Sequence, residues 1–151
     1  FCSTKKKVAE LERALKSDDY EVKSISSDLE QKKREEVLLG FKARRTRVLV
    51  ATDVMSRGID IKDIDLIINY DVPEDAEDYV HRVGRTARAK GTGVALTMTN
   101  PDDMYKLAKI EKLIESEIMK LPVPVELGES PEWKVRPERK YYNKRKNYRK
   151  K

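Results

Sequence analysis

Residues 79–88 read YVHRVGRTAR, and no other stretch says as much about this chain. It places Arg82, Arg85 and Arg88 three residues apart, directly after the single histidine. On a helix, side chains at this spacing fall along one face, where like charges repel each other. Guanidinium groups suit phosphate oxygens because they donate paired hydrogen bonds and keep their charge. The stretch therefore predicts arginines that share one helix face and meet an anion there. The alternative is a solvated cationic helix end.

A second informative stretch covers residues 48–61, which read VLVATDVMSRGIDI. The apolar run 48–51 is typical of a central strand in a parallel sheet that is covered on both faces. Functional groups tend to gather where such strands end. There, the Thr52 hydroxyl is of the kind that binds phosphate oxygens, and Gly58 permits close backbone approach. A purely structural interpretation is that Asp53 caps a turn and Gly58 forms one.

Together the two stretches resemble motifs V and VI of the DEAD-box ATP-dependent RNA helicases, and their separation is similar. Residues 50–61 resemble motif V, and HRVGRTAR at 81–88 resembles motif VI. Gln31 and Arg34 match the family's Gln-x-x-Arg element. The resemblance implies the second RecA-like domain of such an enzyme over residues 1–120. The fold expected from it is a RecA-like three-layer α/β/α sandwich with a mainly parallel sheet, whose first strand is truncated at Phe1.

The resemblance also implies a role for each matched residue. It implies that Arg85 and Arg88 are catalytic residues at the γ-phosphate, with Arg88 as the arginine finger. Asp60 joins them in binding the nucleotide, near the ribose. Contacts with RNA are implied for Thr52, Gly58, Gln31 and Arg34. Coupling between domains, and between the nucleotide cleft and RNA, is implied for Asp53, Arg57, His81 and Arg82.

Several sequence elements of the family are absent from this chain. It contains no Gly-x-x-x-x-Gly-Lys-Ser/Thr phosphate loop, no Asp-Glu-Ala-Asp in that order and no Ser-Ala-Thr. In this family those elements bind the phosphates of ATP and its magnesium ion. We therefore expect no metal site here, and we expect an N-terminal RecA-like domain of the same polypeptide to hold ATP and Mg²⁺. The 151 residues alone are expected to be inactive.

Charge is distributed unevenly along the chain. Residues 134–151 carry ten Lys/Arg and one acid, or +9, whereas residues 1–133 carry 23 Lys/Arg and 26 Asp/Glu, or −3. A basic tail attracts polyanions without sequence preference, and its tyrosines can stack on bases. A disordered solubilising tail is an equal alternative. An alternative function is accordingly a non-enzymatic RNA-binding module that acts through this tail.

The remaining sequence alternates between strand and helix patterns, which favours a parallel α/β fold. Strands are expected within 20–26, 48–51, 64–68 and 94–98. Helices are expected after a Ser3 or Thr4 cap, from a Ser27–Glu30 capping box to about Phe41, after Pro73, and from Asn100 to before Pro122. Residues 121–133 are expected to form an extended linker.

The cellular setting is predicted from what the sequence lacks. One cysteine, Cys2, excludes a disulfide framework and fits a reducing cytoplasm. Apolar runs are too short to span a membrane. We expect a cytoplasmic, monomeric chain whose partners are RNA and the N-terminal RecA-like domain.

Overall fold

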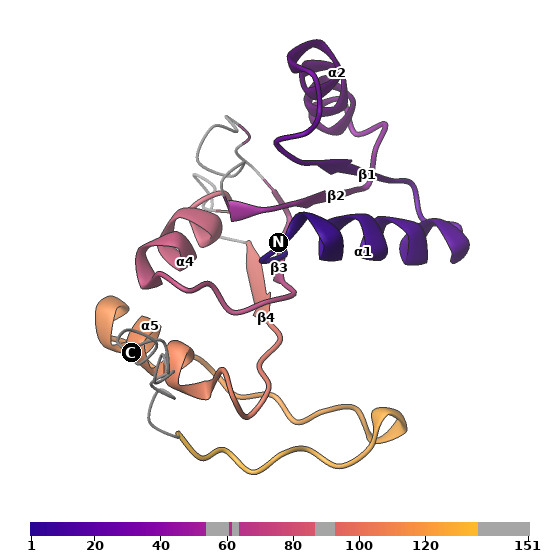
Figure 1. Cartoon of the computed structure of the whole chain (residues 1–151). Helices are drawn as coiled ribbons and strands as arrows, with labels where there is room; N and C mark the ends of the chain where they lie inside the picture. The colour runs from indigo at the N-terminus through magenta and orange to yellow at the C-terminus, as the bar shows by residue number, and fades with distance from the viewer. Residues whose placement is uncertain (54–60, 62–63, 87–92, 136–151) are drawn as a thin grey trace, which may run out of the picture.

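The structure is a computed structural model of the chain, and it describes residues 1–53, 61, 64–86 and 93–135. Helices and strands alternate along these residues (Figure 1). Their order is α1 (Lys5–Ser17), β1 (Val22–Ile25), α2 (Gln31–Lys42), β2 (Val48–Ala51), β3 (Leu66–Asn69), α4 (Ala76–Val83), β4 (Val94–Thr97), α5 (Met104–Ile114) and the 3₁₀ turn η1 (Val125–Leu127).

The strands form two parallel ladders. β1 pairs with β2, with Val22 opposite Val48, and β3 pairs with β4, with Leu66 opposite Val94. Parallel neighbours need a crossover connection, and helix α2 provides it between β1 and β2. The parallel α/β architecture expected from the alternating pattern is therefore confirmed.

The first two residues join these ladders. Cys2 forms a parallel bridge with Thr52, and its N–H donates to the carbonyl of Ala51 at 2.9 Å. On the other side, the carbonyl of Phe1 accepts the N–H of Tyr70 at 2.9 Å. Phe1 and Cys2 thus lie between β2 and β3, in the position expected for the end of a strand.

Apolar side chains cover both faces of the β1–β2 ladder. Val48 and Val50 pack with Val8 of α1, whereas Leu49 packs in a separate cluster with Phe41 of α2. Successive residues of a strand point to opposite faces, so α1 and α2 lie on opposite sides of the sheet, as Figure 1 shows. A third cluster joins α4 to α5 through Val72, Tyr79, Leu107 and Ile110.

The predicted capping box at the start of α2 is wrong. The helix begins at Gln31, its N-cap is Glu30, and Glu30 makes no capping hydrogen bond through its side chain. Ser27 lies in a turn, which is closed by a hydrogen bond from the N–H of Leu29 to the carbonyl of Ser26 at 3.2 Å. Asp28 accepts a hydrogen bond from Lys5 of α1 at 2.5 Å, but both side chains are exposed, so this contact adds little stability. Ser27 and Asp28 form the turn itself, and the helix begins only after it.

The last helix is shorter than predicted. α5 ends at Ile114, because Glu115 adopts a left-handed backbone with φ of 52°. Ile118 still packs on the α4–α5 cluster from non-helical backbone, and its N–H donates to Oε1 of Glu111 at 2.8 Å. The apolar spacing that predicted a longer helix therefore reports burial of Ile118 and not its conformation.

Asp71, just after β3, ties this strand to the start of α1. Its Oδ2 accepts the Ser3 N–H at 2.8 Å and the Ser3 hydroxyl at 2.9 Å, and its Oδ1 pairs with Lys7. Burial alone would raise the pKa of the Asp71 carboxyl, but the bonds from Lys7 and Ser3 hold that pKa below its usual value. A lowered pKa in the folded state gives stability that is present above the ordinary aspartate pKa and lost as pH falls through the folded value.

The Asp71→Asn variant tests this contribution. At pH 7 we expect its free energy of unfolding to be lower by about 1–2 kcal/mol, because the half-exposed lysine loses its charged hydrogen-bond acceptor. Urea denaturation of both proteins should show the difference shrinking as the pH falls below the ordinary aspartate pKa, and vanishing once the pH has passed below the lowered pKa of the folded state. Ser3→Ala keeps the charge and should show a smaller deficit at pH 7. A deficit for Asp71→Asn that is the same at every pH would contradict the assignment.

Candidate functional site

The candidate site lies where β2, β3 and α4 end. Thr52 and Asp53 follow β2, Asn69 ends β3, and His81 and Arg82 occupy the last turn of α4. Local side chains stabilise both ends of α4. The Asp75 side chain accepts the N–H of Glu77 at 3.1 Å at its start, and cationic side chains suit the negative end of the helix dipole at its finish.

Arg82 is the centre of the site, and its side chain has no exposure to solvent. Its Nε donates to Oδ1 of Asp53 at 2.5 Å, and its Nη2 lies against the same oxygen. Its Nη1 donates to Oδ1 of Asn69 at 2.9 Å and to the carbonyl of Asp71 at 3.1 Å. The ring of Phe1 covers the guanidinium at 5.2 Å. A buried charge needs such partners, because an unpaired one would cost several kcal/mol.

The prediction that three arginines share one helix face is wrong. α4 ends at Val83, and the N–H of Arg85 donates to the carbonyl of Arg82 at 3.1 Å in the turn that follows. Arg82 points into the domain because the carboxylate of Asp53 draws it there. Arg85 is half-buried in the turn. Arg88 lies outside the described residues.

Gln31 and Arg34 lie together in the first turn of α2. Nη1 of Arg34 donates to Oε1 of Gln31 at 3.0 Å, and Nη2 donates to the carbonyl of Leu29 at 3.2 Å. Because β1 and β2 are parallel, the loop from β1 to α2 leaves the sheet at the edge where Thr52 follows β2. The structure therefore brings this pair to the same edge as Thr52, which is itself buried.

The other predicted site residues are placed only in part. Of the coupling residues, Asp53 and Arg82 meet in an ion pair, whereas His81 is exposed on α4. Arg57, Gly58 and Asp60 lie outside the described residues, so their roles stay predictions. Within the described ranges, no group of three or more His, Cys, Asp or Glu side chains is arranged to hold a metal ion. The helices of these ranges are all too short or too polar to cross a membrane.

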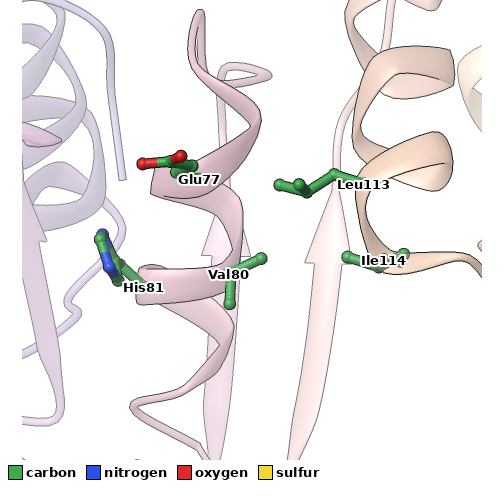
Figure 2. Close-up of a pocket in the computed structure, with 5 residues that line it drawn as sticks. All are labelled: Glu77, Val80, His81, Leu113 and Ile114. Carbon is green, nitrogen blue, oxygen red and sulfur yellow. The ribbon is translucent and has the colours of Figure 1, made fainter.

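A shallow groove lies beside this site, between α4 and α5. In Figure 2, Leu113 of α5 points toward α4, and Val80 lies on the side of α4 that faces α5. Glu77, His81 and Ile114 complete the lining, and in Figure 2 the side chains of Glu77 and His81 point away from α5. Its floor is apolar and its rim carries one carboxylate, which suits neither a phosphate group nor a metal ion. We therefore place the functional site at the strand ends and not in this groove.

Sequence reasoning missed two members of the site. Asn69 bonds the Arg82 side chain, and Asp71 contributes its backbone carbonyl. A signal was present, because the apolar run of β3 breaks at Asn69, and a buried polar side chain at the end of a parallel strand needs a partner.

Comparison with known proteins assigns the chain. Residues 1–90 match the family described as helicase conserved C-terminal domain. The chain is 41% identical over 126 residues to the ATP-dependent RNA helicase FAL1 of Mycosarcoma maydis, covering 83% of this chain and 32% of that protein. It is 41% identical over 123 residues to eukaryotic initiation factor 4A of Dictyostelium discoideum, covering 82% and 30%.

Solved structures agree with these matches. A DEAD box protein from the hyperthermophile Methanococcus jannaschii is 43% identical with a TM-score of 0.76, covering 80% of this chain and 33% of that one. The E. coli DEAD-box protein SrmB, bound to regulator of ribonuclease activity A, is 34% identical with a TM-score of 0.79, covering 89% and 78%. The chain therefore belongs to the helicase conserved C-terminal domain family, in its DEAD-box branch. The predicted RecA-like fold is confirmed, and the chain spans about a third of the length of the curated relatives it matches.

Thr86, in the motif VI segment, is 4% exposed and lies against Gly93. A Cβ on Gly93 would overlap the hydroxyl and the carbonyl oxygen of Thr86. At Gly40 in α2, by contrast, a Cβ would meet only Oγ1 of Thr46 at 3.5 Å, which is an ordinary contact. Gly93 thus lets the strand β4 begin close to the turn that follows α4.

We expect Gly93→Ala to lower the free energy of unfolding by about 1–3 kcal/mol, because the turn must move to admit the methyl group. The matched variant Gly40→Ala should be neutral or stabilising by up to about 1 kcal/mol, since alanine favours the helix interior. Urea denaturation of the three proteins measures both effects. Equal behaviour of the two alanine variants would show that the close approach of Gly93 to Thr86 is not required.

Proposed function

We propose that this chain is the second RecA-like domain of an ATP-dependent RNA helicase, acting in RNA-stimulated ATP hydrolysis and local duplex unwinding. Its curated relatives bear the name of that activity. A solved relative, Dbp5 of S. cerevisiae, is bound to RNA and ADP BeF3, at 34% identity and a TM-score of 0.71, covering 78% of this chain and 32% of that one. The observation that carries the proposal is the buried pair of Arg82 and Asp53, which fastens the beginning of motif V to motif VI.

ATP is the proposed substrate, and this domain would supply positive charge to it. Arg85 lies in the turn that begins at Arg82, and Arg88 follows it in the sequence, so the buried pair sets the position of the turn that carries Arg85. In the proposal both face the γ-phosphate, with Arg88 as the arginine finger, and Asp60 lies near the ribose. A positioned guanidinium offsets charge on the transferred phosphoryl group, an effect worth about 10³–10⁵ in other phosphoryl-transfer enzymes.

Magnesium belongs to the other domain in this proposal. In the described residues, no group of three or more His, Cys, Asp or Glu side chains is arranged to hold a metal ion. The N-terminal RecA-like domain of the same polypeptide would hold Mg²⁺ and the ATP phosphates. When bound, the ion neutralises charge between the β- and γ-phosphates.

RNA is the second proposed ligand. Arg34 is held by Gln31 and the Leu29 carbonyl, so its guanidinium loses little freedom when it meets a phosphate. Gln31, Arg34, Thr52 and Gly58 would together contact the RNA backbone. Asp53, Arg57, His81 and Arg82 would couple this surface to the nucleotide cleft and to the neighbouring domain. ATP and RNA would then close the two domains together, and hydrolysis would let them part.

The isolated chain should show no RNA-stimulated ATP hydrolysis, because it lacks the phosphate loop and the metal-binding motif. A coupled assay with saturating ATP, Mg²⁺ and a short RNA duplex measures this. The full-length protein, assayed in parallel, should turn over ATP and unwind the duplex. Turnover by the 151 residues alone would refute the division of labour between two domains.

Arg88→Ala in the full-length protein should reduce kcat by about 10³-fold, since the charge of the finger acts mainly in the transition state. Its dissociation constant for RNA should change by less than about threefold, or about 0.6 kcal/mol. Arg13→Ala, which removes an exposed arginine of α1, is the matched control and should leave both values unchanged. Equal losses of turnover and RNA affinity would make Arg88 an RNA contact instead.

A further inference from the structure

Asn69 is fully buried at the end of β3, where an apolar side chain would be expected from the strand pattern. We infer that Asn69 is a positioning residue, which holds the guanidinium of Arg82 against Asp53 and so fixes the turn that carries Arg85. The functional half of this inference rests on the proposed function. The structural half, the placement of Arg82, does not.

Both ends of the Asn69 amide are used. Its Oδ1 accepts Nη1 of Arg82 at 2.9 Å, and its Nδ2 donates to Oγ1 of Thr97 at 3.0 Å. A guanidinium can only donate, so Arg82 dictates which way the amide faces, and the amide nitrogen must then face Thr97. One series of polar contacts thus runs from Asp53 after β2, through Arg82 of α4 and Asn69 of β3, to Thr97 of β4.

Chemistry explains why an amide stands at this position. A leucine would leave Nη1 of Arg82 with the Asp71 carbonyl as its acceptor, inside a site that solvent does not reach. An aspartate would compete with Asp53 for the guanidinium and add a second buried charge. A neutral acceptor leaves the ion pair with Asp53 intact and still fixes the plane of the guanidinium. Burying an amide for packing alone would be unfavourable, since its polar atoms must find partners.

Backbone hydrogen bonds link the position of Arg82 to the turn that contains Arg85. The backbone carbonyl of Arg82 accepts the N–H of Arg85 at 3.1 Å, and the carbonyl of Arg85 accepts the N–H of Ile64 at 3.3 Å. A shift of the Arg82 side chain toward or away from Asp53 would therefore displace the turn at Arg85. Small displacements of charged groups cost catalysis more than binding, because the transition state demands their position.

The first test uses the full-length protein. Asn69→Leu should lower kcat of RNA-stimulated ATP hydrolysis by about tenfold or more, while KM for ATP and the RNA dissociation constant stay within about threefold. Thr97→Val, which frees only the far end of the amide, should lower kcat by a smaller factor. Ser24→Ala is the control, because it removes a hydrogen bond to Glu12 at 2.5 Å, remote from Arg82. It should leave kcat unchanged.

The second test needs no activity and uses the 151-residue chain. The Nε–H resonance of Arg82, assigned by its loss in Arg82→Lys, should exchange slowly with solvent in the parent chain. It should shift and exchange faster in Thr97→Val, and more so in Asn69→Leu. If Asn69→Leu does not fold, the shift and exchange rate of the Arg82 Nε–H resonance in Thr97→Val test the positioning role.

The possible outcomes distinguish the positioning role of Asn69 from the proposed function of the chain. An Arg82 Nε–H resonance that neither variant moves would overturn the positioning role. So would a kcat that stays within about twofold of the parent in both variants, or a loss shared equally by kcat, KM and RNA affinity. Absence of RNA-stimulated turnover in the parent full-length protein would remove the proposed function instead, and the resonance would still report on Asn69.

Discussion

The buried cation of Arg82 organises the described part of this domain. Taking a guanidinium out of water is costly, and the cost is met only when charged and polar partners surround it. Arg82 obtains them from three separate segments, namely Asp53 after β2, the end of β3 with Asn69 and the Asp71 carbonyl, and the ring of Phe1. Each segment must arrive in place for the charge to be tolerated. The ion pair is therefore a test of correct assembly as well as a link between motifs V and VI.

The sheet explains why these partners meet. Parallel strands end at one edge, so residues that follow β1, β2 and β3 converge there although they are far apart in the sequence. The α2 pair Gln31 and Arg34 reaches the same edge from β1. The described motif residues Gln31, Arg34, Thr52 and Asp53 thus share one border of the sheet.

Much of the fold followed from local signals, whereas contacts between distant segments did not. The apolar run 48–51 and the Thr4 cap predicted β2 and the start of α1, and both are confirmed. The Ser27–Glu30 pattern failed, because Ser27 and Asp28 form a turn and α2 begins only at Gln31. At the site, the three-residue spacing of the arginines aimed Arg82 at an external anion, whereas the motif resemblance implied a coupling role for it. No spacing rule reveals that Asp53 lies near enough to pair with Arg82, since that depends on how the residue after β2 meets the end of α4 in the folded domain.

The hydrophobic interior is divided, and the division has a consequence for dynamics. Two clusters flank β1 and β2, a third joins α4 to α5, and the polar contacts around Arg82 lie between them. Apolar contacts tolerate sliding, whereas hydrogen bonds to a planar guanidinium permit one alignment. The two halves should consequently behave as separate cooperative units in native-state hydrogen exchange, with the opening of either half releasing Arg82. The rigidity of the domain should therefore depend more on the hydrogen-bond geometry around Arg82 than on the amount of apolar surface that is buried.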